Sequence, residues 1–175
     1  LYWSDETYIH YGFKPQEFVP TYEKFSSIVH PDDLAFTQKH VNESLQNDAE
    51  YDIEFRSVRP NGEIRYLYTR GDVTRDADGK AIRFVGSQID ITERKRAEQT
   101  QALQGAMLDA TPGFVGFADA RDTHILYINP AGRKMVGVQA QENVTQLKIA
   151  DVHPEWTNKL LRDEFIPTAI RDGIW

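Results

Sequence analysis

Apolar and polar residues alternate most regularly in the middle of the chain. Residues 51–57 alternate with a period of two, which is typical of a half-buried strand. Asn61-Gly62 follows, and this pair predicts a two-residue type I′ turn with positive φ at both positions. A second strand over residues 64–69 should fold back on the first. After the turn-rich residues 76–79, the β-branched and aromatic run 82–91 completes a predicted antiparallel meander.

A charged helical segment follows this meander. The side chain of Asp90 can cap a helix while Glu93, three residues later, reaches back to it, which is the capping-box spacing. We expect the helix to run from Thr92 to about Asp109. Its second half carries apolar residues at coiled-coil-like spacing, which indicates some tendency to dimerise, namely Leu103, Ala106, Met107 and Ala110.

Short helices are predicted before the meander. Tyr2-Trp3 is typical of the end of a strand, and Ser4 then begins a short helix that ends at Gly12. A second helix should follow Thr21, since apolar residues recur there at helical spacing. A longer helix should run from Pro31 to about Asn47.

An internal repeat relates the end of the chain to its beginning. Residues 2–4 and Gly12 match residues 127–129 and Gly137, and the segment 29–32 matches 152–155 with a similar separation. In this alignment Gly173-Ile174-Trp175 lies where the first copy enters its strand at Tyr51. The second copy also has an opening hairpin, with strands over residues 113–119 and 125–128 and a helix opened by Asn129-Pro130.

The turns, the last strand and the charged helix together resemble a PAS domain, a small α+β sensor fold. The residues that carry the resemblance are Asn61-Gly62, Asp78-Gly79, the run from Phe84 to Thr92, and Glu93-Arg94-Lys95. The resemblance implies a five-stranded antiparallel sheet with helices on one face, followed by a linker helix and a second, truncated PAS copy. The implied domains are residues 1–92 without a first strand, a linker at 93–110 and the second copy at 111–175.

In PAS domains, the inner face of the sheet and the facing helices line a pocket. The resemblance places Tyr51 and Thr69 on that face, together with these ligand-pocket candidates: Phe25, Ile28, Leu34, Val41, Ile53, Phe55, Ser57, Leu67, Phe84, Gly86 and Gln88. The alternative is a filled core, which is the usual fate of large apolar residues at strand spacing.

Gln88 differs from the other candidates because a buried amide needs hydrogen-bond partners. It could bind a ligand, or it could satisfy a backbone group at the end of the strand. Flavin-binding members have a glutamine at this position. Flavin adduct chemistry is not expected, because the chain has no cysteine and because Ser57 and Leu67 replace an asparagine pair of those members. Haem is not expected either, since the one candidate ligand, His40, lies to one side of the apolar stripe of its helix.

The resemblance also implies a signal output at Asp90, Thr92 and Glu93, where the last strand of the sheet ends and the linker helix begins. If Gln88 points inward, the opposite face of the sheet is too apolar for water. We expect a flanking helix or a second subunit to cover it. The residues of this outer face are Ile64, Tyr66, Tyr68, Val85, Ile89 and Ile91.

Composition excludes several classes of function. The absence of cysteine among 175 residues excludes disulfides and zinc–thiolate sites, and a net charge of −7 disfavours nucleic-acid binding. No apolar run approaches the length of a membrane helix. His30 and His153 each precede a proline and an acid, with no nucleophile or second metal ligand spaced nearby. We therefore predict no catalytic residue and no metal site.

The expected function is a cytoplasmic sensory module within a longer protein, because Leu1 lies in the middle of a folded pattern. It would bind a small ligand or a partner, form a homodimer and signal to a kinase or cyclase domain in the same chain. The family association points to a bacterial sensor histidine kinase, with a diguanylate cyclase or phosphodiesterase as the alternative. A scaffold module with a filled core is a further alternative.

Overall fold

The computed structural model describes residues 1–47 and 49–172 and divides into two compact units, residues 1–99 and 100–175. Gly173-Ile174-Trp175, which the repeat alignment placed at the entry to a strand, lie outside the described residues. The boundary between the units falls within one helix, and each unit is considered by itself below.

Three helices open the first unit. Helix α1 (Asp5–His10) begins after Ser4, whose hydroxyl accepts a hydrogen bond from Thr7 N, as predicted. Helix α2 (Tyr22–Ile28) is capped in the same way by Thr21. Helix α3 (Pro31–Asn47) has the predicted bounds, with proline in its first turn.

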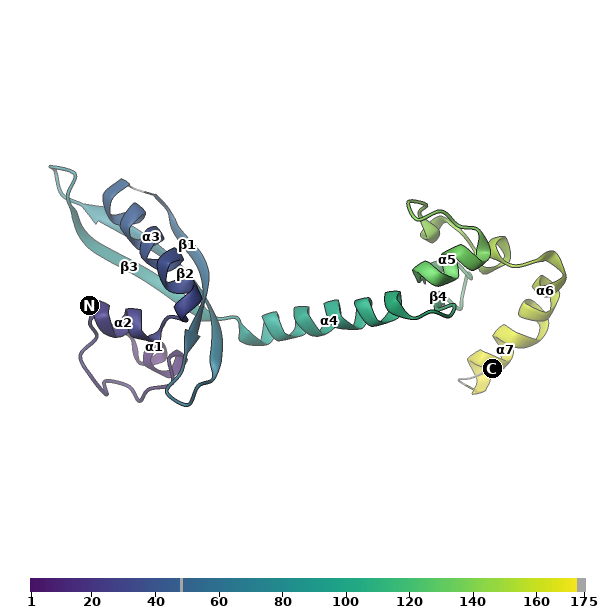
Figure 1. Cartoon of the computed structure of the whole chain (residues 1–175), viewed down its shortest axis with the longest axis horizontal. Helices are drawn as coiled ribbons and strands as arrows, with labels where there is room; N and C mark the ends of the chain where they lie inside the picture. The colour runs from purple at the N-terminus through teal and green to yellow at the C-terminus, as the bar shows by residue number, and fades with distance from the viewer. Residues whose placement is uncertain (48, 173–175) are drawn as a thin grey trace. The chain divides into compact units, whose positions relative to one another are not determined.

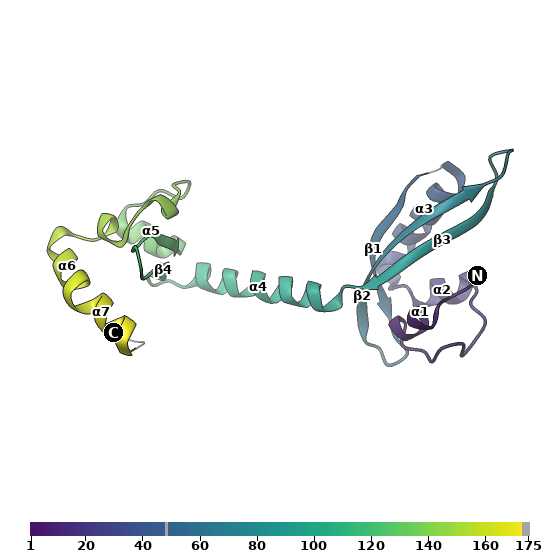
Figure 2. The same cartoon turned by 180° about the vertical axis from the view of Figure 1, so that it is seen from behind.

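The predicted meander is confirmed as a sheet in the order β1-β2-β3, formed by β1 (Tyr51–Val58), β2 (Ile64–Arg75) and β3 (Ala81–Asp90). The second strand is six residues longer than its pattern indicated. Helix α3 lies in front of the sheet in Figure 1 and behind it in Figure 2, so the helices cover one face of the sheet. The register places Phe55 opposite Leu67, and Thr69 opposite Gln88, on this inner face.

The predicted type I′ turn is wrong. Gly62 has φ of +82°, but Asn61 does not have positive φ, and Gly62 N donates to Arg59 O over 2.8 Å. Pro60 is a central residue of this four-residue turn, and its ring fixes φ at a negative value. The Asn61 side chain instead accepts a hydrogen bond from Glu63 N at 3.0 Å.

The single five-stranded sheet is not present among the described residues, which form one sheet of three strands and one of two. Tyr2 and Trp3 are not in a strand, because they pair with no neighbouring strand. Trp3 is nevertheless buried, and its ring packs edge-on against Tyr8 with centroids 5.3 Å apart. Trp3 is therefore held by aromatic packing rather than by a sheet, while Leu1 and Tyr2 are exposed.

The core of the first unit lies between the helices and the inner face of the sheet. Its apolar centre is formed by Trp3, Tyr8, Tyr11, Ile28, Val29, Tyr51, Ile53, Phe55 and Leu67. An ion pair ties the start of α3 to β1, since Arg56 donates to both carboxylate oxygens of Asp33, at 2.6 Å and 3.0 Å. The hydrogen bonds from Arg56 lower the pKa of Asp33, although partial burial opposes them.

The helix predicted from Thr92 to about Asp109 is confirmed as α4 (Thr92–Ala110). Beyond it, the second unit contains the hairpin β4 (Gly116–Ala118) and β5 (Ile125–Ile128), then α5 (Pro130–Val136). Two short 3-10 helices follow, η1 (Val144–Gln146) and η2 (Ile149–Val152). The unit ends in the continuous helical run of α6 (Glu155–Leu160), the π-helical turn η3 (Leu161–Phe165) and α7 (Ile166–Asp172).

Asn129 holds the second unit together. Its side-chain oxygen accepts hydrogen bonds from Val115 N and Gly132 N, both at 2.9 Å. Its amide nitrogen donates to the carbonyls of Leu108 and Thr111 at the end of α4, and to that of Gly113. One fully buried amide therefore joins the end of α4, the strand β4 and the start of α5.

Candidate functional site

The first unit contains a cleft of about 430 Å³ between its N-terminal segment, α1, α2, α3 and the inner face of the sheet, here called the aromatic cleft. Its lining includes Leu1, Tyr2, Trp3, Ser4, Glu6, Thr7, His10, Tyr11, Tyr22, Phe25, Val41, Tyr51, Phe55, Thr69, Phe84, Gly86, Ser87 and Gln88. The volume lies within the range of pockets that hold small molecules.

Six of the eleven ligand-pocket candidates line this cleft, namely Phe25, Val41, Phe55, Phe84, Gly86 and Gln88. Ile28, Ile53, Ser57 and Leu67 do not. They are fully buried in the core, and Leu34 packs against it. Both alternatives for the inner face therefore apply, each to a different part of the sheet. One part is a filled core, and the other part borders the cleft.

Tyr11 is the hydrogen-bond partner of Gln88. The Gln88 amide nitrogen donates to the Tyr11 hydroxyl oxygen over 2.8 Å. Burial raises the pKa of Tyr11, and the nearby Tyr51 adds to the rise, so the hydroxyl stays protonated at neutral pH. Sequence reasoning missed Tyr11 because it lies just after α1, 77 residues from Gln88, and nothing local connects the two.

The polar groups of the aromatic cleft carry little charge. No lysine or arginine is among its described lining residues. Glu6 and His10 pair with each other at 3.4 Å, and the Glu6 side chain is largely exposed. Gln88 Oε1 and Thr69 Oγ1 are buried and have no hydrogen-bond partner among the described residues.

The end of β3 is tied directly to the start of α4. Asp90 Oδ1 accepts a hydrogen bond from Thr92 N at 2.9 Å, and Asp90 Oδ2 lies 3.3 Å from an Arg65 guanidinium nitrogen. The Thr92 hydroxyl accepts a hydrogen bond from Tyr66 N at 3.0 Å. Partial burial raises the pKa of Asp90, but the hydrogen bonds from Thr92 and the charge of Arg65 outweigh it and leave the pKa below its ordinary value.

The predicted capping box does not form. The helix begins at Thr92, so Asp90 lies one residue too far upstream to be the capping residue, and it bonds to Thr92 N instead. The Glu93 carboxylate pairs with Arg96 at 3.0 Å and does not reach back to Asp90. Residues of β2 therefore help to hold the start of the helix in place of Glu93.

The first turns of α4 also contact the outer face of the sheet. Glu54 on β1 accepts hydrogen bonds or ion pairs from Arg94 and Lys95, each at 2.6 Å. The Tyr66 hydroxyl lies 3.4 Å from the Gln99 amide nitrogen. All the residues of these contacts belong to the first unit.

The predicted outer face is only partly covered. Val85 and Ile89 are 49% and 55% exposed, and Ile64 is 39% exposed, while Tyr66 and Tyr68 are half-buried. Ile91 departs from the prediction, because it is buried within its own chain at the sheet-to-helix junction. The alternation of strand faces no longer applies there, since β3 ends at Asp90 and the chain turns into α4.

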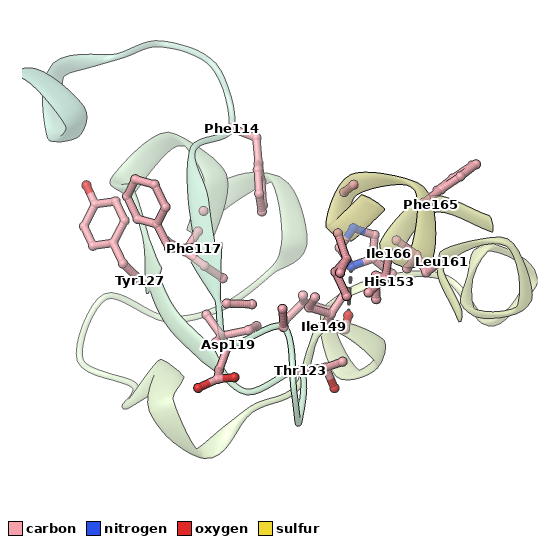
Figure 3. Close-up of a pocket in the computed structure, with 18 residues that line it drawn as sticks. Phe114, Phe117, Asp119, Thr123, Tyr127, Ile149, His153, Leu161, Phe165 and Ile166 are labelled. Carbon is pink, nitrogen blue, oxygen red and sulfur yellow. Dashed lines mark hydrogen bonds between the residues drawn. The ribbon is translucent and has the colours of Figure 1, made fainter. Parts of the chain in front are cut away.

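A second cleft, of about 660 Å³, lies in the second unit between the hairpin and the helical run 161–170 (Figure 3) and is called the hairpin cleft. Phe114, Phe117 and Tyr127 stand on its hairpin side, and Leu161 and Ile166 on its helical side. Its few polar groups are already engaged. His153 Nδ1 bonds to Ile149 O at 2.8 Å, and Asp119 pairs with Arg121.

The remaining histidine candidates make local contacts. His40 packs on Phe36, with ring centroids 4.2 Å apart, and its Nδ1 lies 2.9 Å from Phe36 O. His30 Nδ1 accepts a hydrogen bond from Asp32 N. The described residues contain no group of three or more histidine and acidic side chains placed to hold a metal. None of the described helices combines the length and the apolar character that crossing a membrane requires.

The family described as the PAS fold matches residues 1–88 of the chain. The chain belongs to the PAS family. A solved structure of a sensory box histidine kinase/response regulator from Burkholderia thailandensis superposes on 60% of this PAS chain and 78% of its own with a TM-score of 0.52 and 27% identity.

Curated relatives match parts of the chain at 25% to 31% identity. A methyl sulfide methyltransferase-associated sensor of Methanosarcina acetivorans is 30% identical over 99 residues, 56% of this chain and 10% of its own length. A blue-light-activated histidine kinase of Brucella anthropi is 31% identical over 93 residues, 53% of this chain and 18% of its own. A probable diguanylate cyclase of Escherichia coli is 25% identical over 131 residues, which are 73% of this chain and 12% of its own length. The chain thus spans a fifth or less of these proteins.

Proposed function

We propose that the first unit is a sensory PAS domain that binds a small molecule in the aromatic cleft and passes the change through Asp90 and Thr92 into α4. The relatives named as a sensor, a histidine kinase and a diguanylate cyclase support a signalling role. The parent protein would be a cytoplasmic sensor histidine kinase, with a diguanylate cyclase as the alternative.

The observation that carries this proposal is that the cleft and the helix start share one strand. Gln88 lines the cleft and Asp90 holds Thr92, and both lie on β3 with their side chains on the inner face. A ligand that moves Gln88 therefore acts two residues from the group that fixes the first turn of α4. If β3 has two conformations, a ligand shifts the strand toward the conformation that it binds more tightly.

Native mass spectrometry of the purified chain tests the binding step. We expect a small molecule to be retained by the wild-type protein and lost in Gln88→Leu, while Tyr68→Phe on the outer face retains it. If the folded protein shows only the mass of the bare chain, ligand binding is contradicted and the scaffold alternative is favoured.

The second unit is proposed to be a truncated second PAS copy. The support is a repeated local structure: α1 follows the capping residue Ser4 and is followed by Gly12 at φ +84°, and α5 follows the capping residue Asn129 and ends at Gly137 at φ +76°. In the same way, His30 precedes α3 and His153 lies two residues before α6. In this proposal, the hairpin cleft is the interior of a sheet that the described residues do not complete.

The exposed outer face supports a homodimer as a further part of the proposal. Val85 and Ile89 are exposed apolar residues on the outer face of the edge strand β3, whereas α4 pairs with Glu54 on the other edge strand, β1. Apolar area of this kind is typical of an association surface.

A further inference from the structure

The aromatic cleft contains hydroxyl groups whose hydrogens lack acceptors. Tyr51 is 3% exposed, and its hydroxyl makes no hydrogen bond to any described residue. The Tyr11 oxygen accepts from Gln88, which leaves its own hydrogen without an acceptor among the described residues.

Both tyrosines are donors under ordinary conditions. Burial raises the pKa of Tyr51 as it does that of Tyr11, and the nearby Tyr22 adds to the rise. A neutral phenol that stays protonated donates its hydrogen to an acceptor and cannot balance a negative charge. These two hydroxyls therefore suit a ligand that carries an acceptor atom.

The rest of the lining disfavours an anion and favours a flat ring. An anion would enter a largely apolar space whose described lining holds no lysine or arginine, and its one histidine, His10, is already paired with Glu6 at 3.4 Å. A buried charge without a counter-charge is strongly disfavoured. The walls are aromatic, and Tyr51 and Phe84 meet edge to face with centroids 5.2 Å apart, an arrangement that offers ring faces and edges to an aromatic guest.

We propose that the aromatic cleft takes an uncharged aromatic molecule with a carbonyl-type acceptor, to which the hydroxyl of Tyr51 donates a hydrogen bond. The ligand class rests on the sensory function proposed above. We expect carboxylates, phosphates and nucleotides to bind this cleft weakly.

Equilibrium dialysis of the full 175-residue chain against three naphthalenes tests the ligand class. 2-Acetylnaphthalene carries the acceptor, 2-ethylnaphthalene has the same ring without it, and 2-naphthoate carries a negative charge. We expect 2-acetylnaphthalene to bind about 3- to 10-fold more tightly than 2-ethylnaphthalene, the usual effect of one neutral hydrogen bond, and 2-naphthoate to bind most weakly.

Two tyrosine variants locate the binding. Tyr51→Phe removes only the hydroxyl and should abolish the preference for 2-acetylnaphthalene over 2-ethylnaphthalene. Tyr68→Phe removes a hydroxyl from the outer face of the same sheet and should leave the preference unchanged. An unchanged preference in Tyr51→Phe, or 2-naphthoate binding as tightly as 2-acetylnaphthalene, would overturn the ligand class.

The same experiment separates this proposal from the sensory function. If no naphthalene binds but native mass spectrometry finds a retained molecule that Gln88→Leu loses, the ligand class is wrong and the sensory function stands. If neither method finds a ligand, both proposals fail.

Discussion

Replacement of Asp90 by alanine should loosen the start of α4 more than the sheet. The substitution removes the hydrogen bond from Thr92 N and the 3.3 Å contact with Arg65. Loss of a carboxylate that accepts a hydrogen bond at a helix start costs about 0.5–2 kcal/mol. The ion pair adds roughly 0.5–1 kcal/mol, because Arg65 keeps Glu63 as a partner at 2.9 Å. A local loss of about 1–3 kcal/mol should raise amide hydrogen exchange over residues 92–96 by about 5- to 150-fold.

Two variants separate the contributions. Asp90→Asn keeps an acceptor for Thr92 N and should recover most of the protection. Glu93→Ala should change exchange little, because Glu93 is largely exposed and, among the described residues, its carboxylate pairs with Arg96 alone. Equal protection in Asp90→Ala and wild type would refute the role of Asp90, and an effect of Glu93→Ala as large as that of Asp90→Ala would restore the capping box.

The pH dependence of this junction has a definite sign. The pKa of Asp90 is lowered in the folded chain, so its contribution to stability is present above the pKa of an unfolded aspartate. The contribution is lost as the pH falls below about 4 and through the lower folded value. Protection of residues 92–96 in the wild type should therefore approach that of Asp90→Ala in acid.

Three further changes test other parts of the structure. Asp33→Asn should lower stability at neutral pH and flatten its fall below about pH 4, because Arg56 lowers the pKa of Asp33; urea unfolding at several pH values measures this, and an unchanged slope would contradict it. Ile89→Glu should shift a dimer to monomer in sedimentation velocity, and an unchanged dimer would place the interface elsewhere. Asn129→Ala should leave buried backbone groups unpaired, destabilise the second unit by more than about 2 kcal/mol and raise exchange over residues 108–116; unchanged exchange there would contradict its role.

Local patterns sufficed for the elements of the first unit. Strand periodicity placed Phe55, Phe84 and Gln88 on the inner face, because a side chain's face follows from its position along a strand. The start of α3 followed from Pro31, which is tolerated in a first helical turn. These features depend on residues within a few positions of each other.

Features that depend on distant or competing residues were not predictable. The Asn61-Gly62 pattern failed because Pro60 imposes negative φ on the turn. The partner of Gln88 is Tyr11, and the partners of Thr92 and Asp90 are on β2, so only the folded chain brings them together. The division of the inner face between core and cleft likewise depends on how the N-terminal segment packs against the sheet. Strand periodicity carries no information about that packing.

The most direct test of the central claim is amide hydrogen exchange of α4 in Gln88→Leu. This variant removes the hydrogen bond between Gln88 and Tyr11 and leaves the hydrogen bonds of Asp90 and Thr92 in place. If the cleft is coupled to the helix through β3, exchange over residues 92–96 should rise at least several-fold, and Tyr68→Phe should leave it unchanged. Altered exchange around Gln88 and Tyr11 with wild-type exchange over residues 92–96 would contradict the coupling.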